Sequence, residues 1–285
     1  MNDNNKKIKQ NVECGLNINW FPGHMKKSLE EINNVVSKVN LIIEVVDSRA
    51  INTSSNYELL NIAKNKPILK IALKADYCDI KKSDATFICT TKDKNLRNKI
   101  ILEINKKLED QFNSSRKKGL LHPKFIILVI GLPNVGKSTL INILKNKNTL
   151  IAQNFPGVTK KQAIVSINNE LSLIDTPGVL FKHIEKIEDA YKLTLINCIK
   201  KEIVPLDKVL EYGFNHYYKF HKQELFKYYG INIEINSYSE FINYLANKRK
   251  WFNNKQEIDL NRLETNLFND FSMSKICQTN FEKEN

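Results

Sequence analysis

The stretch Gly131-Leu-Pro-Asn-Val-Gly-Lys-Ser-Thr139 decides the fold of this chain. It follows the apolar run Phe125–Ile130 and precedes Leu140–Leu144, so a buried strand leads into a glycine loop and then into a helix. The pattern G-x-x-x-x-G-K-[ST] binds phosphate in this context, because the glycines let successive N–H groups face phosphate oxygens. The helix N-terminus adds partial positive charge. A chance glycine turn is the alternative, and the flanking strand and helix favour a phosphate-binding loop.

The residues of this loop have separate roles toward a nucleotide. Lys137 can reach the β- and γ-phosphates, and the Ser138 hydroxyl can ligate Mg²⁺. We expect the nucleotide contacts of the loop to come from Asn134, Val135, Gly136, Lys137, Ser138 and Thr139.

Two later stretches have the spacing of nucleotide switches. Asp175-Thr-Pro-Gly178 matches the pattern D-x-x-G, in which Asp175 would hold Mg²⁺ through water and the Gly178 amide would meet the γ-phosphate. Thr159 lies between the phosphate-loop helix and the next strand, where a switch threonine binds Mg²⁺ and the γ-phosphate. Val179 stands where Ras-like enzymes carry the glutamine that orients the attacking water. Either another polar group places that water, or hydrolysis stays slow.

An earlier stretch, Leu73-Lys-Ala-Asp76, resembles the guanine-reading pattern N-K-x-D. The Asp76 carboxylate would accept hydrogen bonds from guanine N1–H and the 2-amino group, and the stem of Lys74 would lie along the base. Leu73 replaces the asparagine of that pattern, so we expect Leu73→Asn to tighten GTP binding by about 1 kcal/mol. Thr90 and Thr91 follow the next strand and would form the last base-contact loop. These residues predict that GTP binds better than ATP.

The chain alternates predicted strands and helices up to about residue 190. We predict strands at 41–46, 67–72, 86–89, 125–130, 163–167 and 171–174, and helices at 57–64 and 95–108. The last two strands have the spacing of a hairpin. This alternation predicts a mostly parallel α/β sheet with helices on both faces and ligand loops at the carboxyl ends of the strands.

The order of the motifs is the reverse of that in an ordinary GTPase. Base-reading elements lie at 73–91 and phosphate elements at 131–178, as a circular permutation would place them without changing their spatial neighbours. We expect a mobile tail over 1–16, a permuted GTPase domain over 17–185 and a helical, aromatic domain over 190–280. In the last domain, apolar residues predict a helix over 195–203, and Ser237 and Asp259 predict two helix N-caps.

Charge and cysteine content indicate the kind of partner and the cellular compartment of this protein. The 285 residues include 44 Lys and Arg against 31 Asp and Glu, which gives a net charge of +13. This excess favours a polyanion such as RNA or an acidic membrane face, or else reflects a lysine-rich composition. The five scattered cysteines indicate reduced thiols, and no apolar run approaches the ~18 residues of a membrane helix. We therefore expect a cytoplasmic protein. We also expect a monomer.

From about residue 18 to 275, the motifs together resemble the circularly permuted GTPases of the bacterial ribosome biogenesis GTPase A family and their mitochondrial relatives. The stretches that carry this resemblance are Trp20-Phe-Pro-Gly-His-Met25, Asp47-Ser-Arg49, Lys74-Ala-Asp76, Gly131–Ser138, Pro156-Gly-Val-Thr159 and Asp175–Gly178. The sequence departs from the family pattern at Leu73, at Thr90-Thr91 and at Trp251–Lys255.

The resemblance implies GTP hydrolysis coupled to late assembly of the large ribosomal subunit, with an RNA-binding helical domain. It also implies a K⁺ ion ligated by Asn134, and the alternative is that Asn134 only shapes the loop. The alternative is a nucleotide-gated rRNA- or ribosome-binding protein with negligible turnover. A P-loop ATPase or kinase is disfavoured because Asp76 lies at a guanine-reading position.

His24 is the candidate catalytic residue. It follows the turn Pro22-Gly23, which can hold its ring out of the core, and imidazole can orient or deprotonate water near neutral pH. The alternative is that Trp20, Phe21 and His24 attach this segment to the domain or to RNA. The sequence leaves both roles open.

Overall fold

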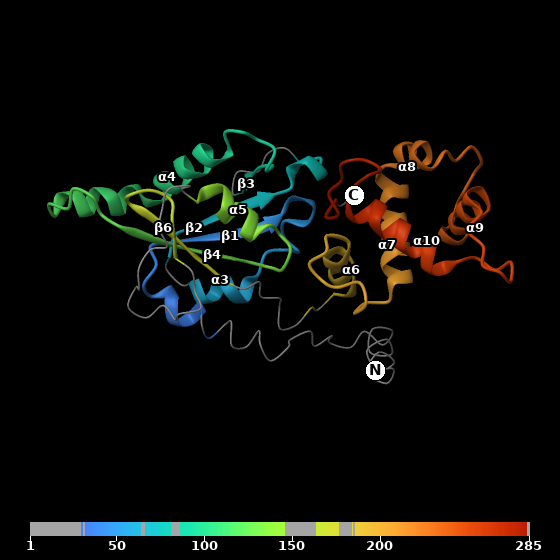
Figure 1. Ribbon diagram of the computed structural model, residues 1–285, viewed down its shortest axis with the longest axis horizontal. Coiled ribbons are helices and arrows are strands. Elements are labelled where there is room, and N and C mark those ends of the chain that lie inside the picture. The colour runs from blue at the N-terminus through green and yellow to red at the C-terminus, as the bar shows by residue number, and fades with distance from the viewer. Residues whose placement is uncertain are drawn as a thin grey trace. The chain divides into compact units, whose positions relative to one another are not determined.

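The computed structural model in Figure 1 describes residues 30, 32–63, 66–80, 86–145, 164–176, 184 and 186–283. The described residues form two compact units. One unit contains the sheet and its helices, and the other contains the residues from Ile184 onward together with the short segment Tyr77–Asp79. The N-terminal tail, His24, Thr159, Gly178 and Val179 lie outside the described residues.

A six-stranded sheet forms the centre of the first unit, in the order β3-β2-β1-β4-β6-β5. All neighbouring strands are parallel except β5 and β6, which form the predicted antiparallel pair. The strands are β1 (Leu41–Asp47), β2 (Ile68–Leu73), β3 (Phe87–Ile88), β4 (Phe125–Gly131), β5 (Ile164–Ser166) and β6 (Leu171–Asp175). The central strands β1 and β4 are buried along their whole length, which explains why both are almost continuously apolar. The predicted parallel α/β sheet is confirmed.

Helices cover both faces of this sheet. The helices α4 (Leu96–Lys117) and α5 (Lys137–Leu144) pack on one face, and α3 (Tyr57–Ala63) lies on the other (Figure 1). Two short 3-10 helices, η1 (Ser48–Ala50) and η2 (Ala75–Tyr77), follow β1 and β2.

Helix α4 continues well beyond its predicted end near residue 108. Its buried stripe runs on to Phe112, whose ring centroid lies 4.4 Å from that of Phe125. The helix therefore ends only at Lys117, shortly before Gly119, which has a φ of +83°. The sequence prediction stopped too early because the residues after Leu108 are mostly polar.

The second unit is a helical bundle built around α7. Its helices are α6 (Ile187–Leu195), α7 (Leu206–Phe220), α8 (Lys222–Tyr229), α9 (Tyr238–Arg249) and α10 (Leu260–Ser272). Helix α7 packs against each of the other four. Aromatic rings fill this core, with Phe214 stacked on Phe241 at 4.7 Å between centroids. Gly213 permits the close approach of α10, since a Cβ there would lie 2.7 Å from the Phe271 ring.

Two cap predictions in this unit are confirmed and one helix prediction is wrong. Ser237 accepts a hydrogen bond from the Glu240 amide (3.2 Å), and Asp259 accepts one from the Arg262 amide (3.1 Å). The helix predicted over 195–203 does not form, because α6 ends at Leu195 and Asn197 adopts a φ of +63°. The apolar stripe indicated burial correctly for Leu195, Ile196 and Ile199, but of these only Leu195 lies in a helix. Helices α7 and α8 were not predicted individually.

Two global properties can be stated for the described residues. None of their helices is long and apolar enough to span a membrane. The cysteines among them, Cys78, Cys89, Cys198 and Cys277, are free thiols.

Candidate nucleotide site

The predicted phosphate loop lies between β4 and α5. Gly131 ends the strand with a φ of +150°, and Gly136 caps the helix with a φ of +109°, so both adopt conformations that favour glycine. Lys137 is buried and its Nζ donates to the Leu132 carbonyl within the same loop, at 2.8 Å. Val135 is buried, whereas Asn134, Ser138 and Thr139 are exposed. This arrangement is the strand, glycine loop and helix that the motif requires.

Strand β6 places Asp175 beside this loop, because β6 pairs with β4. Burial raises the pKa of the Asp175 carboxyl above its usual value, and the Lys137 ammonium opposes that shift. Asp175 and Ser138 offer the hard oxygen ligands that Mg²⁺ prefers. The described part of the chain contains no group of three or more His, Cys, Asp or Glu that could hold a metal by themselves. A Mg²⁺ ion held by Asp175 and Ser138 would leave coordination positions for the oxygens of a bound phosphate.

The predicted base-reading stretch, Leu73–Asp76, contacts the predicted phosphate loop directly. Lys74 follows β2 with a φ of +65°, and its Nζ donates to the Asn134 carbonyl at 2.9 Å. Leu73 is buried against the loop, since a Cβ on Gly136 would lie 2.8 Å from Leu73 Cδ1. Residues that are about 60 positions apart in the sequence are thus neighbours in space.

Asp76 lies at the centre of a small hydrogen-bonded group. Its carboxylate accepts from Thr90 Oγ1 at 2.9 Å and pairs with Lys92 Nζ at 2.8 Å. Partial burial alone would raise the pKa of Asp76, but the hydrogen bonds from Lys92 and Thr90 lower it, so the carboxylate is ionised at neutral pH. Thr91 is exposed beside this group. Sequence reasoning missed Lys92, which carries no motif of its own.

Sequence reasoning also assigned no role to Asp47, the last residue of β1, or to Arg49 in η1. The Asp47 carboxylate is fully buried and receives Arg49 Nε and Nη2, each at 2.9 Å. It also pairs with Lys74 Nζ at 2.8 Å. Their position at the end of a buried strand is the sequence feature that could have identified them as candidate site residues.

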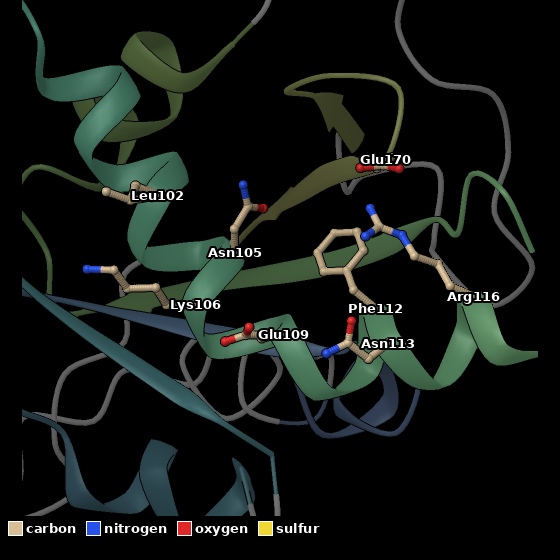
Figure 2. A pocket seen from close by; sticks show the side chains of 8 residues that line it. All are labelled: Leu102, Asn105, Lys106, Glu109, Phe112, Asn113, Arg116 and Glu170. Atoms are coloured by element: carbon tan, nitrogen blue, oxygen red, sulfur yellow. The ribbon is translucent and has the colours of Figure 1, made fainter.

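A separate pocket of about 340 Å³ lies along α4 and contains none of these residues. Figure 2 shows its wall, in which Phe112, Asn113 and Arg116 come from α4 and Glu170 from the turn between β5 and β6. The Arg116 guanidinium lies 5.6 Å from the centroid of the Phe112 ring. None of the predicted nucleotide-contacting residues lines this pocket, so it is distinct from the candidate site.

Comparison with known proteins agrees with this geometry. Residues 126–229 match a family described as "50S ribosome-binding GTPase". A probable ribosome biogenesis GTPase A from Mycoplasma pneumoniae is 39% identical over 245 residues, which cover 86% of this chain and 88% of that protein. The chain belongs to the ribosome biogenesis GTPase A family.

Other members of the family and one group of relatives match over similar lengths. Ribosome biogenesis GTPase A from Bacillus licheniformis is 30% identical and covers 93% of this chain and 98% of its own length. Mitochondrial GTPase 1 from Schizosaccharomyces pombe is 28% identical and covers 73% of each chain. The resemblance to this family and to its mitochondrial relatives is confirmed.

Solved structures of a family member support the fold. The GDP-bound and GNP-bound structures of YlqF from Thermotoga maritima each have a TM-score of 0.63 and 25% identity to this chain. They cover 89% and 90% of this chain and 98% of their own. The match covers the P-loop GTPase sheet and continues into the helical C-terminal region.

Proposed function

We propose that this chain binds and hydrolyses GTP as an assembly factor in late maturation of the large ribosomal subunit, in the cytoplasm. One observation carries this proposal: the Lys74 ammonium joins the base-reading stretch to the phosphate loop, with its Nζ 2.9 Å from the Asn134 carbonyl. The contact supports a single nucleotide site, because it brings together two motifs that stand in reversed order along the chain. The family to which the chain belongs supports the ribosomal role.

Guanine selectivity would rest on Asp76. The ionised carboxylate, oriented by Thr90 and Lys92, would pair with the two donors of guanine, and adenine would leave it without these partners. Leu73 supplies an apolar contact to Gly136 where the pattern has an amide. Thr91 and Thr90 would complete the base pocket.

Hydrolysis would use the phosphate loop and two metal ions. Mg²⁺ would be held by Ser138, Asp175 and Thr159, and it would neutralise the charge that develops on the phosphates. Lys137 and the Gly178 amide would meet the β- and γ-phosphates. The exposed Asn134 amide would ligate K⁺, which can stabilise charge in place of an arginine finger.

His24 would orient the attacking water on the ribosomal particle, because Val179 has no polar group for that task. The competing role is docking of the N-terminal segment to RNA. Substituting His24→Ala distinguishes them: catalysis requires kcat to fall about tenfold or more while subunit binding is unchanged. An unchanged kcat together with a loss of subunit binding would make His24 a docking residue.

The helical region from 190 to 280 would bind rRNA through cations stacked on rings. Lys222 Nζ lies 4.5 Å from the Tyr218 centroid, and the Arg249 guanidinium lies 5.5 Å from the Trp251 centroid. Side chains of these kinds can stack on bases and contact phosphates.

One assay tests the function as a whole. GTP and ATP hydrolysis by the full chain are measured with and without large-subunit particles, in KCl and in NaCl. We expect GTP to be preferred, turnover to rise with the particles, and KCl to support faster turnover than NaCl. Binding of GTP and particles without turnover would instead identify a nucleotide-gated binding protein, and equal use of ATP would refute the guanine assignment.

A further inference from the structure

Two residues with left-handed backbone conformations are tied together at the candidate site. Lys74 has a φ of +65° and Asn134 a φ of +60°, conformations that residues other than glycine adopt only at an energetic cost. One belongs to the base-reading stretch and the other to the phosphate loop. The hydrogen bond from Lys74 Nζ to the Asn134 carbonyl links them at 2.9 Å. The surroundings must hold both conformations in place.

Asp47 provides the charge that holds Lys74 there. Asp47 pairs with Leu73 in the register of β1 and β2, which places Lys74 immediately beyond it. The carboxylate is fully buried, and its Oδ2 lies 2.8 Å from Lys74 Nζ and 2.9 Å from Arg49 Nη2. Burial alone would raise the pKa of Asp47, but the charges of Arg49 and Lys74 lower it to about 2. Asp47 is therefore an anion throughout the physiological range.

We infer that Asp47 is a positioning residue for the guanine nucleotide, acting through Lys74. Its carboxylate fixes the Lys74 ammonium against the phosphate loop, so that the base-reading stretch and the loop are pre-organised relative to each other. Arg49 compensates the buried anion by contacting both carboxylate oxygens, and Oδ2 also pairs with Lys74. This inference rests on the proposed guanine site, and it adds a role for the Asp47-Ser-Arg49 motif at the end of β1.

Pre-organisation of Lys74 affects binding more than chemistry. Without the Asp47 charge, the Lys74 side chain must be ordered when the nucleotide binds, which lowers affinity. This ordering cost is the same for GTP and GDP, so the affinity for both should fall by the same factor. Because the interactions with the γ-phosphate are unchanged, KM should rise while kcat stays nearly constant.

A double-mutant cycle tests the inference. Asp47→Asn, Lys74→Met and the double variant are titrated with GDP and with a non-hydrolysable GTP analogue, and urea unfolding of each is followed in parallel. We expect each single variant to weaken the binding of both nucleotides about tenfold or more, in keeping with a charged hydrogen bond. The double variant should bind no more weakly than the worse single variant, because the two residues act through one contact.

Glu44 provides a matched control on the same strand. It is also fully buried, and it pairs with Lys70 at 3.3 Å just as Asp47 pairs with Lys74. Its partners Ser55, Asn56 and Lys70 belong to segments other than the phosphate loop. Glu44→Gln should lower stability and leave both nucleotide affinities unchanged. A similar fall in affinity in Glu44→Gln would show that any buried charge on β1 has this effect, and would overturn the inference.

The outcomes separate this inference from the proposed function. If the unaltered chain binds no guanine nucleotide, the function fails. If it binds GTP but the effects of Asp47→Asn and Lys74→Met on affinity add, Asp47 does not act through Lys74 and only the inference fails. Should Asp47→Asn not fold because Arg49 is left as a buried charge, the cycle is repeated with Asp47→Asn/Arg49→Met, which removes that charge. Additive effects in that background would equally overturn the inference.

Discussion

Among single residues, Gly131 and Gly119 allow the cost of a steric clash to be distinguished from the cost of a strained backbone. Both have positive φ, at +150° and +83°, but a Cβ on Gly131 would collide with the Val45 carbonyl, whereas one on Gly119 would meet nothing within 4 Å. We expect Gly131→Ala to lower the free energy of unfolding by about 3 kcal/mol or more, and Gly119→Ala by about 1 kcal/mol. Urea denaturation of both variants measures the difference. Equal destabilisation would show that the contact with Val45 relaxes without cost.

His216 should make the helical unit sensitive to acid. It is buried, and its Nε2 lies 2.8 Å from Thr279 Oγ1. Burial, and then the neighbouring His221 and Lys283, lower the pKa of His216 from 6.5 to about 3. Between these values the unfolded chain binds a proton that the folded chain does not. Stability should therefore fall as the pH drops from 6.5 toward 3, by up to about 1.4 kcal/mol per pH unit.

The check is the slope of unfolding free energy against pH in His216→Gln. The variant should have a smaller slope than the unaltered chain between pH 6.5 and 4. Asp47 does not contribute to the slope in this pH range. Because its pKa is lowered in the folded chain, its contribution to the free energy of unfolding is complete above pH 3.8 and is lost only as the pH falls toward 2. His221, whose pKa burial also lowers, accounts for a remaining slope. An unchanged slope in His216→Gln would contradict the prediction.

The site could be predicted where its chemistry is local in sequence. Nine consecutive residues specify the phosphate loop, so the pattern predicted its strand, glycines and helix correctly. The contacts of Asp47 and Asn134 with Lys74 could not be predicted in this way. They span 27 and 60 residues and depend on which strands are neighbours in the sheet.

At the scale of elements, capping offers a test of the helical unit. Asp259 accepts a hydrogen bond from the Arg262 amide at 3.1 Å and caps α10, whereas Asn95 at the start of α4 makes no such bond. Asp259→Ala should therefore lower the free energy of unfolding by about 1 kcal/mol, and Asn95→Ala should have little effect. Thermal or urea unfolding compares the two variants. A larger destabilisation in Asn95→Ala would contradict the role given to the cap.

Helix boundaries were harder to predict than helix existence, for physical reasons. Asn197 follows the end of α6 and adopts a left-handed conformation. No glycine or proline marks this helix end in the sequence, so the apolar residues after Leu195 were predicted as helix. In α4 the opposite error occurred, because Phe112 extends a buried stripe through an otherwise polar segment. The strands were predicted more closely, since burial on both faces makes each one a short apolar run.

At the scale of the whole molecule, the excess positive charge is distributed unevenly. Residues 1–183 contain 29 Lys and Arg against 16 Asp and Glu, whereas residues 184–285 contain 15 of each. The segment 92–124, which includes α4, alone has ten basic and four acidic residues. Phosphate neutralisation dominates the salt dependence of RNA binding. If the charge serves RNA binding, most of that salt dependence should come from the first 183 residues.

Two sets of three exposed lysines test this expectation. One set lies on and just after α4 and the other on α7 and α8, and the two triple variants are Lys107→Gln/Lys117→Gln/Lys118→Gln and Lys219→Gln/Lys222→Gln/Lys227→Gln. Binding of each to large-subunit particles is measured over a range of KCl concentrations. The slope of log K against log[KCl] should become shallower by roughly 0.7 to 0.9 for each RNA phosphate that the variant no longer neutralises, and more so in the α4 variant. The α7–α8 variant loses the proposed rRNA contact of Lys222, so its slope should also become shallower, but by less than in the α4 variant, because residues 184–285 carry as many acidic as basic residues. Equal slopes in both variants and the unaltered chain would mean that the charge excess reflects composition and does not serve RNA binding.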